Sequence, residues 1–487
     1  MAVASHPPSH RQGPVVWWAV VASLALALAA AVVGGPPVRA ASPAATGAAC
    51  DTPLQALIDQ APAGSDLVVP PCVYRESVTV DKPLTIDGTG AVIDGRDASG
   101  AVVRDAWMTI AASDVTIRGF AMRYASNKPQ TGALRVEPGV ARLTVAACDL
   151  GFAAGANVSI GVADQSTITG CSIHDAGQLG VHVGGDGTNG IGNAVIDDRI
   201  FHNNTAGYDP GFEAGGLKAT LQKGLVIKGD EVYDNAGPGI WCDIECQDVT
   251  ISGDRVHDNA DAGIFYEVSQ GGLIQDNDVW GNGWQDPDWG WGAGILLSSS
   301  GTTAVTGNTV AWNATGIAVI SQDRKDWPHA ATGVRVDDNL IAASRGRYVL
   351  AWLQDWPGEL FKPASANGGT NDRYWVDGAP GSEGRFAWDG DIGSATAFAA
   401  TPGGRAGGYV ASGAIQGLLE AAGVPLGPSA LDVPPPLPAQ VIRTAQAHPL
   451  VAGVAVVGGV VAVVVVVLAV TFWRRRQRRS PADVVAP

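Results

Sequence analysis

The chain has 487 residues, of which 46% are hydrophobic and 16% are charged, and its formal net charge is −16. This composition excludes a disordered chain, and the 64 glycines follow no three-residue period, which excludes a collagen-like chain. The acidic balance argues against nucleic acid as a partner and against anionic membrane surfaces bound through bulk charge, and it suits solubility or bound cations.

The first 40 residues have the pattern of an export signal. Residues 15–33 are apolar and follow Arg11, and the small-residue site Val38-Arg39-Ala40 comes after them. This order predicts a secretory signal peptide over residues 1–40, cleaved after Ala40. The apolar run is long for a signal peptide, so an uncleaved anchor is the alternative.

Residues 50–110 begin the folded body. A helix-like stretch from Leu54 to Gln60 lies between Cys50 and Cys72, and short alternating runs such as Val78-Thr79-Val80 follow it. Because cysteines of exported proteins are often oxidised, we expect Cys50 and Cys72 to form a disulfide that clamps this N-terminal cap.

Residues 111–345 contain a repeated unit without any helical pattern. Each unit joins a short strand, a turn that bears asparagine, and a second strand that begins with Gly-Ile. The clearest Gly-Ile strands are Gly239-Ile240-Trp241-Cys242-Asp243-Ile244, Gly263-Ile264-Phe265-Tyr266-Glu267-Val268, Gly294-Ile295-Leu296-Leu297 and Gly316-Ile317-Ala318-Val319. The period of roughly 23 to 31 residues is that of a solenoid. The pattern predicts an all-β fold, a parallel β-helix whose coils stack about 4.8 Å apart, with the helix before it as the cap.

The other four cysteines also fall on this repeat. Cys148 and Cys171 occupy matching positions of successive units, which places them within disulfide reach. Cys242 and Cys246 meet only if the chain turns between them. We expect structural roles for all of these cysteines, since no Cys/His spacing fits a zinc site.

Alternation along the Gly-Ile strands separates inward from outward side chains. The isoleucines point inward, and the outward positions of stacked strands form one strip. This strip contains His182, Lys218, Trp241 and Phe265, with Asp243, Glu267 and Ser298 beside them, and Glu213 enters just before Lys218. The position of His182 in the strip is the least defined, because an irregular coil follows it.

The carboxylates are the leading candidates for chemistry. Asp243 and Glu267 are expected about one coil apart, where like charges raise the pKa of one of them. Such a pair suits a nucleophile with an acid/base, or oxygen ligands for a possible Ca²⁺. Lys218 is a candidate base or a clamp for a sugar carboxylate, and Glu213 is a fourth catalytic candidate. The alternative is that these acids are ordinary solvated surface.

Two insertions interrupt the repeat, at residues 206–216 and 281–293, and such excursions tend to gather on the binding face of a solenoid. The second insertion carries Trp289 and Trp291. With Trp241, Phe265 and His182, these aromatic side chains predict a platform for sugar rings. The alternative is a packed loop that covers the sheet.

The turn asparagines are predicted to be structural. They match in register from one unit to the next and are expected to form a ladder of side-chain amides. The ladder contains Asn203, Asn235, Asn259, Asn282 and Asn313. His174 and His257 precede such turns and are expected at the surface.

The last third of the chain is expected to contain a C-terminal cap, a spacer and a membrane-spanning segment. Residues 346–424 are expected to form the last strands and a C-terminal cap with a short helix at 414–422, and residues 425–448 a proline-rich spacer. Residues 449–473 are apolar and long enough to form one C-terminal transmembrane helix. The arginine-rich tail at 474–487 is expected in the cytoplasm, which places the body outside the cell membrane.

Three motifs carry a resemblance to a known family: Glu213-Ala214-Gly215-Gly216-Leu217-Lys218 and the strands that begin at Gly239 and Gly263. Over roughly residues 50–400 the chain resembles the right-handed parallel β-helix repeat proteins of the pectate-lyase-like superfamily, in particular exported bacterial members. The resemblance implies polysaccharide chemistry of the lyase, epimerase or glycosidase type. The chain lacks a Trp-Ile-Asp-His stretch of pectate lyases and a Gly-His-Gly of polygalacturonases, so the reaction type is not implied.

These observations lead to two hypotheses. The first is a surface-anchored enzyme that acts on an extracellular polysaccharide. The second is a non-catalytic glycan-binding adhesin or a structural surface spacer.

Overall fold

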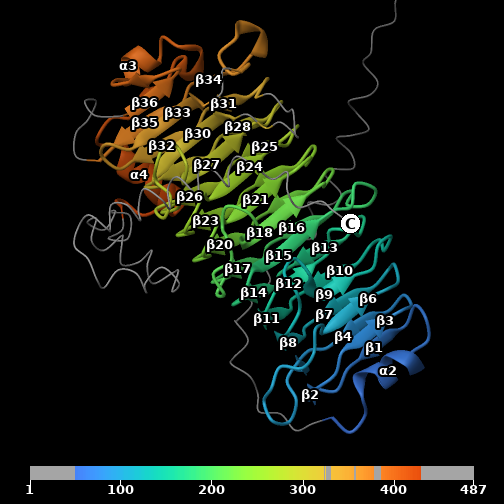
Figure 1. Ribbon diagram of the computed structural model, residues 1–487. Helices are drawn as coiled ribbons and strands as arrows, with labels where there is room; N and C mark the ends of the chain where they lie inside the picture. The colour runs from blue at the N-terminus through green and yellow to red at the C-terminus, as the bar shows by residue number, and fades with distance from the viewer. Residues whose placement is uncertain (1–49, 323, 325–330, 356–357, 378–384, 429–487) are drawn as a thin grey trace, which may run out of the picture. The chain divides into compact units, whose positions relative to one another are not determined.

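The computed structural model describes residues 50–322, 324, 331–355, 358–377 and 385–428 (Figure 1). The chain divides into two compact units, residues 1–45 and 46–487, and every described residue belongs to the second. The expected signal peptide, membrane helix and tail lie outside the described residues. Within these ranges no helix is long and apolar enough to cross a membrane.

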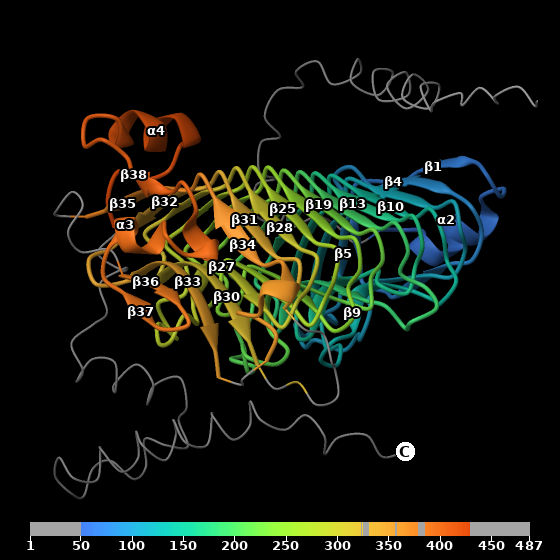
Figure 2. The same ribbon diagram turned by 90° about the horizontal axis from the view of Figure 1, so that it is seen from above.

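The described strands form three sheets in which the neighbours of each strand come from the preceding and following coils (Figures 1 and 2). Sheet B contains β1 (Asp66–Val68), β4 (Thr85–Asp87), β7 (Thr116–Arg118), β10 (Thr144–Ala146), β13 (Thr167–Thr169), β16 (Ala194–Ile196), β19 (Val226–Lys228), β22 (Thr250–Ser252), β25 (Leu273–Gln275), β28 (Ala304–Thr306), β31 (Arg335–Asp337) and β34 (Gly368–Thr370).

Sheet A contains β2 (Val73–Tyr74), β5 (Val92–Asp94), β8 (Ala121–Ala125), β11 (Asp149–Ala153), β14 (Ser172–His174), β17 (Arg199–Phe201), β20 (Glu231–Tyr233), β23 (Arg255–His257), β26 (Asp278–Trp280), β29 (Thr309–Ala311), β32 (Leu340–Ala343), β35 (Arg373–Val376) and β38 (Gly408–Tyr409).

Sheet C contains β3 (Val78–Val80), β6 (Met108–Ile110), β9 (Gly132–Val136), β12 (Ala156–Ser159), β15 (Leu179–Gly184), β18 (Gly215–Thr220), β21 (Ile240–Asp243), β24 (Ile264–Glu267), β27 (Ala293–Ser298), β30 (Thr315–Ser321), β33 (Tyr348–Gln354), β36 (Arg385–Trp388) and β37 (Asp391–Ile392). Among the described strands, neighbours pair in parallel except for the antiparallel pair β36–β37. The described helices are α2 (Leu54–Gln60), α3 (Ala395–Phe398) and α4 (Ile415–Ala422), with 3-10 turns at Pro363–Ser365 and Pro402–Gly404.

The core lies between the three sheets, and the alternation of the Gly-Ile strands fills it. Ile240, Ile264, Ile295 and Ile317 pair in register and are fully buried. The glycines before Ile240, Ile264 and Ile295 are required by the ladder of turn asparagines, because a side chain would meet an asparagine amide at each of them. A side chain at Gly263, for example, would come within 2.8 Å of the Asn282 amide nitrogen. The predicted solenoid is confirmed, and with it the inward place of the isoleucines.

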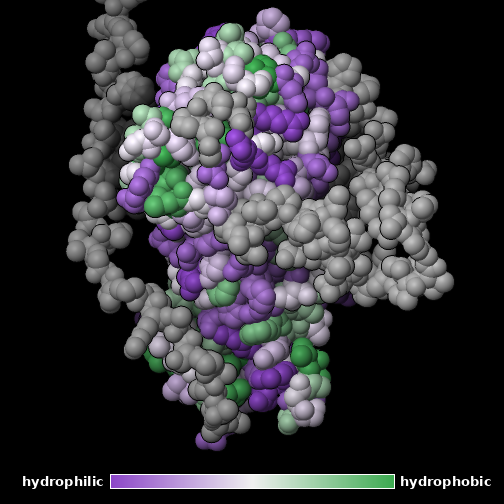
Figure 3. All heavy atoms as spheres, turned by 90° about the vertical axis from the view of Figure 1, so that its left-hand side faces the viewer, coloured by the Kyte–Doolittle hydropathy of each residue, from purple (hydrophilic) through white to green (hydrophobic). Residues whose placement is uncertain are grey.

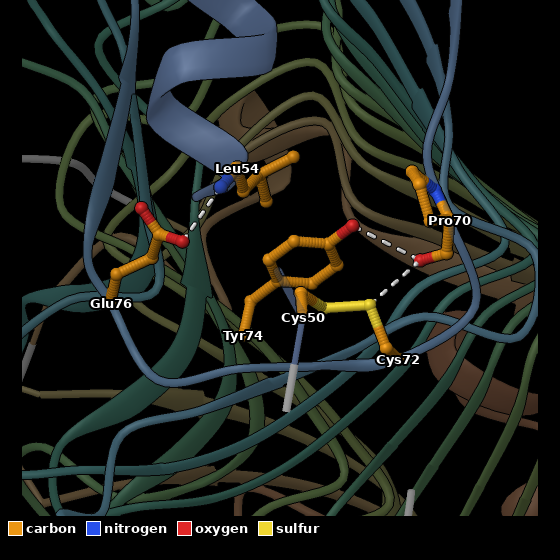
Figure 4. Close-up of a disulfide and its surroundings, with 6 residues drawn as sticks. All are labelled: Cys50, Leu54, Pro70, Cys72, Tyr74 and Glu76. Atoms are coloured by element: carbon orange, nitrogen blue, oxygen red, sulfur yellow. Dashed lines mark hydrogen bonds between the residues drawn. A yellow bond between two sulfur atoms is a disulfide. The ribbon is translucent and has the colours of Figure 1, made fainter. Parts of the chain in front are cut away.

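The N-terminal cap has the predicted helix and the predicted disulfide (Figure 4). Cys50 and Cys72 are bonded across 22 residues of sequence. Glu76 accepts hydrogen bonds from the backbone amides of Leu54 and Gln55, at 2.7 and 3.2 Å, and so satisfies two of the open N–H groups of α2. The helix buries Leu54 and Ile58 against the first coil.

The prediction of disulfides Cys148–Cys171 and Cys242–Cys246 is wrong, because all four of these cysteines are free and buried. The Cys148 amide donates to Cys171 Sγ at 3.3 Å, and burial raises the pKa of the Cys171 thiol. The chain does turn after Cys242, through left-handed residues at 244 and 245. Cys246 Sγ then lies 3.5 Å from the carbonyl oxygen of Asp243. The two pairs therefore remain free thiols, and backbone groups contact the sulfur atoms of Cys171 and Cys246.

The turns between sheets A and C contain the predicted asparagine ladder. Asn235 Nδ2 donates to Asn259 Oδ1 at 2.9 Å, and Asn259 Nδ2 donates to Asn282 Oδ1 at 3.0 Å. The second ladder, in the turns between sheets B and A, was not predicted. It runs from Asn277 through Asn308 to Asn339.

Aspartates continue the second ladder at both ends. Asp230 and Asp254 are 1% exposed, and each has a second carboxylate oxygen, Oδ2, without a hydrogen-bond partner. Burial raises the pKa of Asp254 to about 7 and that of Asp372 to about 7. These carboxyl groups are therefore protonated in the folded protein under mildly acidic conditions, where the unfolded chain ionises them.

We predict that Asp254→Asn stabilises the protein at pH 7 and above by a few kcal/mol. The pKa of Asp254 is higher in the folded protein than in the unfolded chain. The contribution of this carboxyl group to the free energy of unfolding is therefore fully present below pH 3.8 and is lost as the pH rises through about 7. An asparagine removes this loss and supplies a donor for Asn277 Oδ1, as its neighbours in the ladder do. Chemical unfolding of the wild type and the variant between pH 4 and pH 8 measures the difference in their free energies of unfolding. A variant whose stability falls with pH as steeply as the wild type contradicts this assignment.

Sheet A carries a column of aromatic rings on its outward face, stacked face to face except for the edge-on contact between Phe152 and His174. It comprises Tyr124, Phe152, His174, Phe201, Tyr233, His257 and Trp280, with centroids 4.2 to 5.5 Å apart. His174 and His257 are thus partly buried between rings rather than loose on the surface. Helix α4 packs beside the end of this column, against Trp280 and Trp312, so it covers a side of the solenoid. Figure 3 shows that side as a mixture of hydrophilic and apolar patches.

Candidate functional site

Strand register brings the predicted strip together on the outward face of sheet C. His182 pairs with Lys218, Lys218 with Trp241, and Trp241 with Phe265. This confirms the place of His182, which the irregular coil had left undefined. Arg135 and Ser159 precede His182 in the same column. Thr220, Asp243 and Ser298 belong to the parallel column two residues further along, with Glu267 paired to Ser298.

Exposure changes along this strip. Ser159, His182 and Thr220 are partly exposed. Lys218 is 6% exposed, Asp243 8% and Glu267 6%, which places these charged groups at or below the surface. The strip therefore has an open half, on β12 and β15, and a covered half that begins at β18.

Lys218 is the centre of the covered half. Its Nζ lies 3.0 Å from Asp243 Oδ2 and 3.6 Å from the centroid of the Trp241 ring. The same ammonium donates to the carbonyl oxygen of Phe212, which comes from the first insertion. A carbonyl, a carboxylate and an aromatic ring thus compensate one buried cation.

Glu267 has a different cation. It forms an ion pair with Arg324, which follows β30, and it accepts a hydrogen bond from Trp241 Nε1 at 3.2 Å. Trp241 in turn stacks on Phe265, with centroids 5.3 Å apart and ring planes 9° apart. Trp241 is 2% exposed, so neither ring face is open to a sugar in this conformation.

The two carboxylates therefore do not form the isolated like-charged pair expected from the sequence. Asp243 is neutralised by Lys218, and Glu267 by Arg324. This arrangement does not fit Ca²⁺, whose sites use carboxylates that are free to converge on the ion. Nowhere in the described ranges do three His, Cys, Asp or Glu side chains group in a way that suits a metal.

His182 lies at the boundary between the open and covered halves. Its Nδ1 is 3.2 Å from Ser159 Oγ, and Gly184 leaves room for its ring, since a side chain there would come within 2.5 Å of Nε2. Burial, together with the nearby charge of Lys218, lowers the pKa of His182 to about 4. The imidazole is therefore neutral at pH 7 and has a nitrogen able to accept a proton.

Glu213 stands apart from the other catalytic candidates. Its Oε2 accepts a hydrogen bond from Gln130 Nε2 at 3.3 Å, which links the first insertion to the loop before β9. The insertion reaches Lys218 through the backbone of Phe212 and not through this carboxylate.

The second insertion lies against sheet C. Trp291 packs on an apolar cluster that includes Trp241, Phe265 and Leu296, and a side chain at Gly290 would meet Leu353. Trp289 is 36% exposed and borders a depression of about 70 Å³ with Arg347 and Tyr348. Trp291 therefore packs over the sheet, as the packed-loop alternative expected. Trp289 keeps an accessible ring.

Three contributors to the site were absent from the sequence analysis. Ser159 was detectable, since Val158-Ser159 aligns with Val181-His182 in the repeat. The Phe212 carbonyl and Arg324 had no sequence signal, because both come from irregular segments whose path the repeat does not define.

The comparisons with known proteins agree with this architecture. Residues 136–310 match the family model described as a right handed beta helix region. No curated protein matches the chain.

Three solved structures illustrate the similar folds. The A-module of a mannuronan C-5 epimerase from Azotobacter vinelandii is 16% identical, with 73% of this chain and 92% of that chain covered and a TM-score of 0.47. The Dettilon tailspike protein is 13% identical, with 66% of this chain and 63% of that chain covered and a TM-score of 0.47. PfbA, a surface adhesin of Streptococcus pneumoniae, is 8% identical, with 68% and 85% covered and a TM-score of 0.37.

Likenesses this distant transfer no site residue and no activity. The three stacked parallel sheets and the family-model match over residues 136–310 together show a parallel β-helix fold.

Proposed function

We propose that the protein binds an extracellular polysaccharide along the outward face of sheet C and acts on it beside His182. One observation carries the proposal: a neutral, partly exposed imidazole adjoins the Lys218–Asp243 ion pair where the open half of the strip ends. The open half gives a chain of sugars a place to lie. The two insertions border the covered half.

The residues suggest how a proton would move there. His182 is the base that we propose, because it is the partly exposed titratable side chain where the open half ends, and Ser159 contacts its ring through Nδ1. The charge of Lys218, beside the base, favours the neutral form of His182. Asp243 holds Lys218 in place, and Glu267 holds Trp241 through the indole N–H. This chemistry suits lyase or epimerase reactions better than a nucleophilic glycosidase.

The test is a panel of polyuronates and neutral polysaccharides incubated with the full chain, followed for unsaturated products, epimerised residues and reducing ends. We expect turnover of one class, a loss of at least about 100-fold in His182→Ala with binding retained, and a smaller loss in Ser159→Ala. Thr250→Ala, an outward change on sheet B, is the matched control and should be neutral. Turnover unchanged in His182→Ala would overturn the assignment.

A second candidate function is a binding module without catalysis. The observation that favours it is the burial of Asp243 and Glu267, both of which are engaged in ion pairs. It predicts retention on a glycan array without any product, and the same panel separates it from the enzyme.

We also propose that residues 1–40 export the body and that residues 449–473 anchor it in the cell membrane, with the tail in the cytoplasm. The length of the apolar run and the arginines after it support this topology. Deletion of residues 449–473 should release the body into the medium. A deleted protein that stays in the cytoplasm would contradict the export of the body.

A further inference from the structure

A second cavity lies at the C-terminal end of sheet B, away from the strip on sheet C. It has a volume of about 400 Å³, within the range of small-molecule sites. Arg335 of β31 lines it, together with Pro402 and Arg405. Strand β31 pairs with β34 at that end of the stack (Figure 2). The segment at 360–367 and Trp388 form its walls.

A glycine of the next coil lies beside Arg335. Arg335 pairs in register with Gly368, and a side chain at Gly368 would come within 3.1 Å of Arg335 Nη1. The Arg335 side chain is 42% exposed, so its guanidinium is accessible. Arg335 is also fixed in direction, because Asp337 binds its Nη2 at 2.8 Å.

The apolar wall consists of aromatic rings. Trp388 contacts Phe361 and Trp352 edge to face, at 5.1 and 5.3 Å between centroids, so neighbouring rings hold its indole in place. Phe361 and Trp388 are both partly exposed and line the cavity. Such a wall suits the apolar face of a ring-shaped ligand.

Three cations border the cavity. Arg335 is paired with Asp337, and Lys362 with Glu359 at 2.6 Å. Arg405 differs, because within the described ranges its side chain forms neither a hydrogen bond nor an ion pair. Among the residues that the structure describes, the Arg405 guanidinium therefore has no acidic partner, and its planar fork matches carboxylate and phosphate oxygens.

We propose that this cavity binds a small sugar that carries an anionic group, a carboxylate or a phosphate. Arg405 and Arg335 take the anion, and Trp388 with Phe361 take the sugar ring. The site goes beyond the proposed action on a polymer, since it accepts a single sugar and uses none of the residues of the strip on sheet C.

The experiment is calorimetric titration of the full chain with glucuronate, glucose 6-phosphate, glucose and inorganic phosphate. We expect the two charged sugars, or one of them, to bind at least tenfold more tightly than glucose and than phosphate alone. The comparison of glucuronate with glucose 6-phosphate decides which anion the site prefers.

Arg405→Met should weaken that binding at least tenfold, and Arg405→Lys should retain part of it. Arg373→Met removes an exposed positive charge from β35 and is the matched control; it should bind as the wild type does. Equal binding of glucose and the charged sugars, wild-type binding by Arg405→Met, or no binding of any probe at millimolar concentration would each overturn the proposal. Because the probes are monosaccharides, this result is independent of whether the strip on sheet C acts on a polymer.

Discussion

Asn259→Ala is expected to lower the free energy of unfolding by about 3–5 kcal/mol. Asn259 Oδ1 accepts from both the amide and the Nδ2 of Asn235, and its own Nδ2 donates to the carbonyl oxygen of Val232 at 2.9 Å. Alanine leaves these buried groups without partners. The asparagine is 2% exposed, so water does not replace the lost amide.

Denaturant unfolding measures this loss, with Gln275→Ala as the control. Gln275 also carries an amide, but it points outward from sheet B and is partly exposed. We expect its replacement to cost less than about 1 kcal/mol. If both variants lose the same free energy, the ladder is not the structural element that we describe.

Lys218→Met is expected to destabilise the protein by about 3–5 kcal/mol, because it leaves the Asp243 carboxylate buried without its cation. The two atoms of this pair are 3.0 Å apart, and their side chains are 8% and 11% exposed. Methionine keeps the length of the side chain and its contact with Trp241. The loss therefore reports the charge rather than the packing.

A double-mutant cycle with Asp243→Asn isolates this pair. We expect the double variant to be more stable than Lys218→Met alone, with a coupling energy of about 1–3 kcal/mol. Additive single losses would show that Lys218 and Asp243 do not act as a pair.

The repeat made the fold predictable because each coil has to satisfy the same two demands. Inward isoleucines fill the core, and asparagines satisfy the turn backbone, so both recur at a fixed offset that the sequence displays. The cap was predictable for a related reason, since the helix at Leu54–Gln60 and its flanking Cys50 and Cys72 are local. The free thiols could not be foreseen, since matching offsets give proximity and not the direction of each sulfur.

The site was predictable only in part. Register placed His182, Lys218 and Trp241 in one column, as the alternation had indicated. The repeat contains no information on what covers that column. Arg324, the Phe212 carbonyl and the loop around Trp291 changed a presumed pair of free acids and an open aromatic platform into buried ion pairs and packed rings.

The location of a bound oligosaccharide is the most direct test of the central claim, that the outward strip of sheet C is the functional surface. A crystal structure of the protein with an oligosaccharide of the polysaccharide found in the panel provides it. We predict sugar over β12, β15 and β18, with a ring within hydrogen-bond distance of His182 and beside Lys218. Sugar bound instead along the ring column of sheet A, with none on sheet C, would contradict the claim.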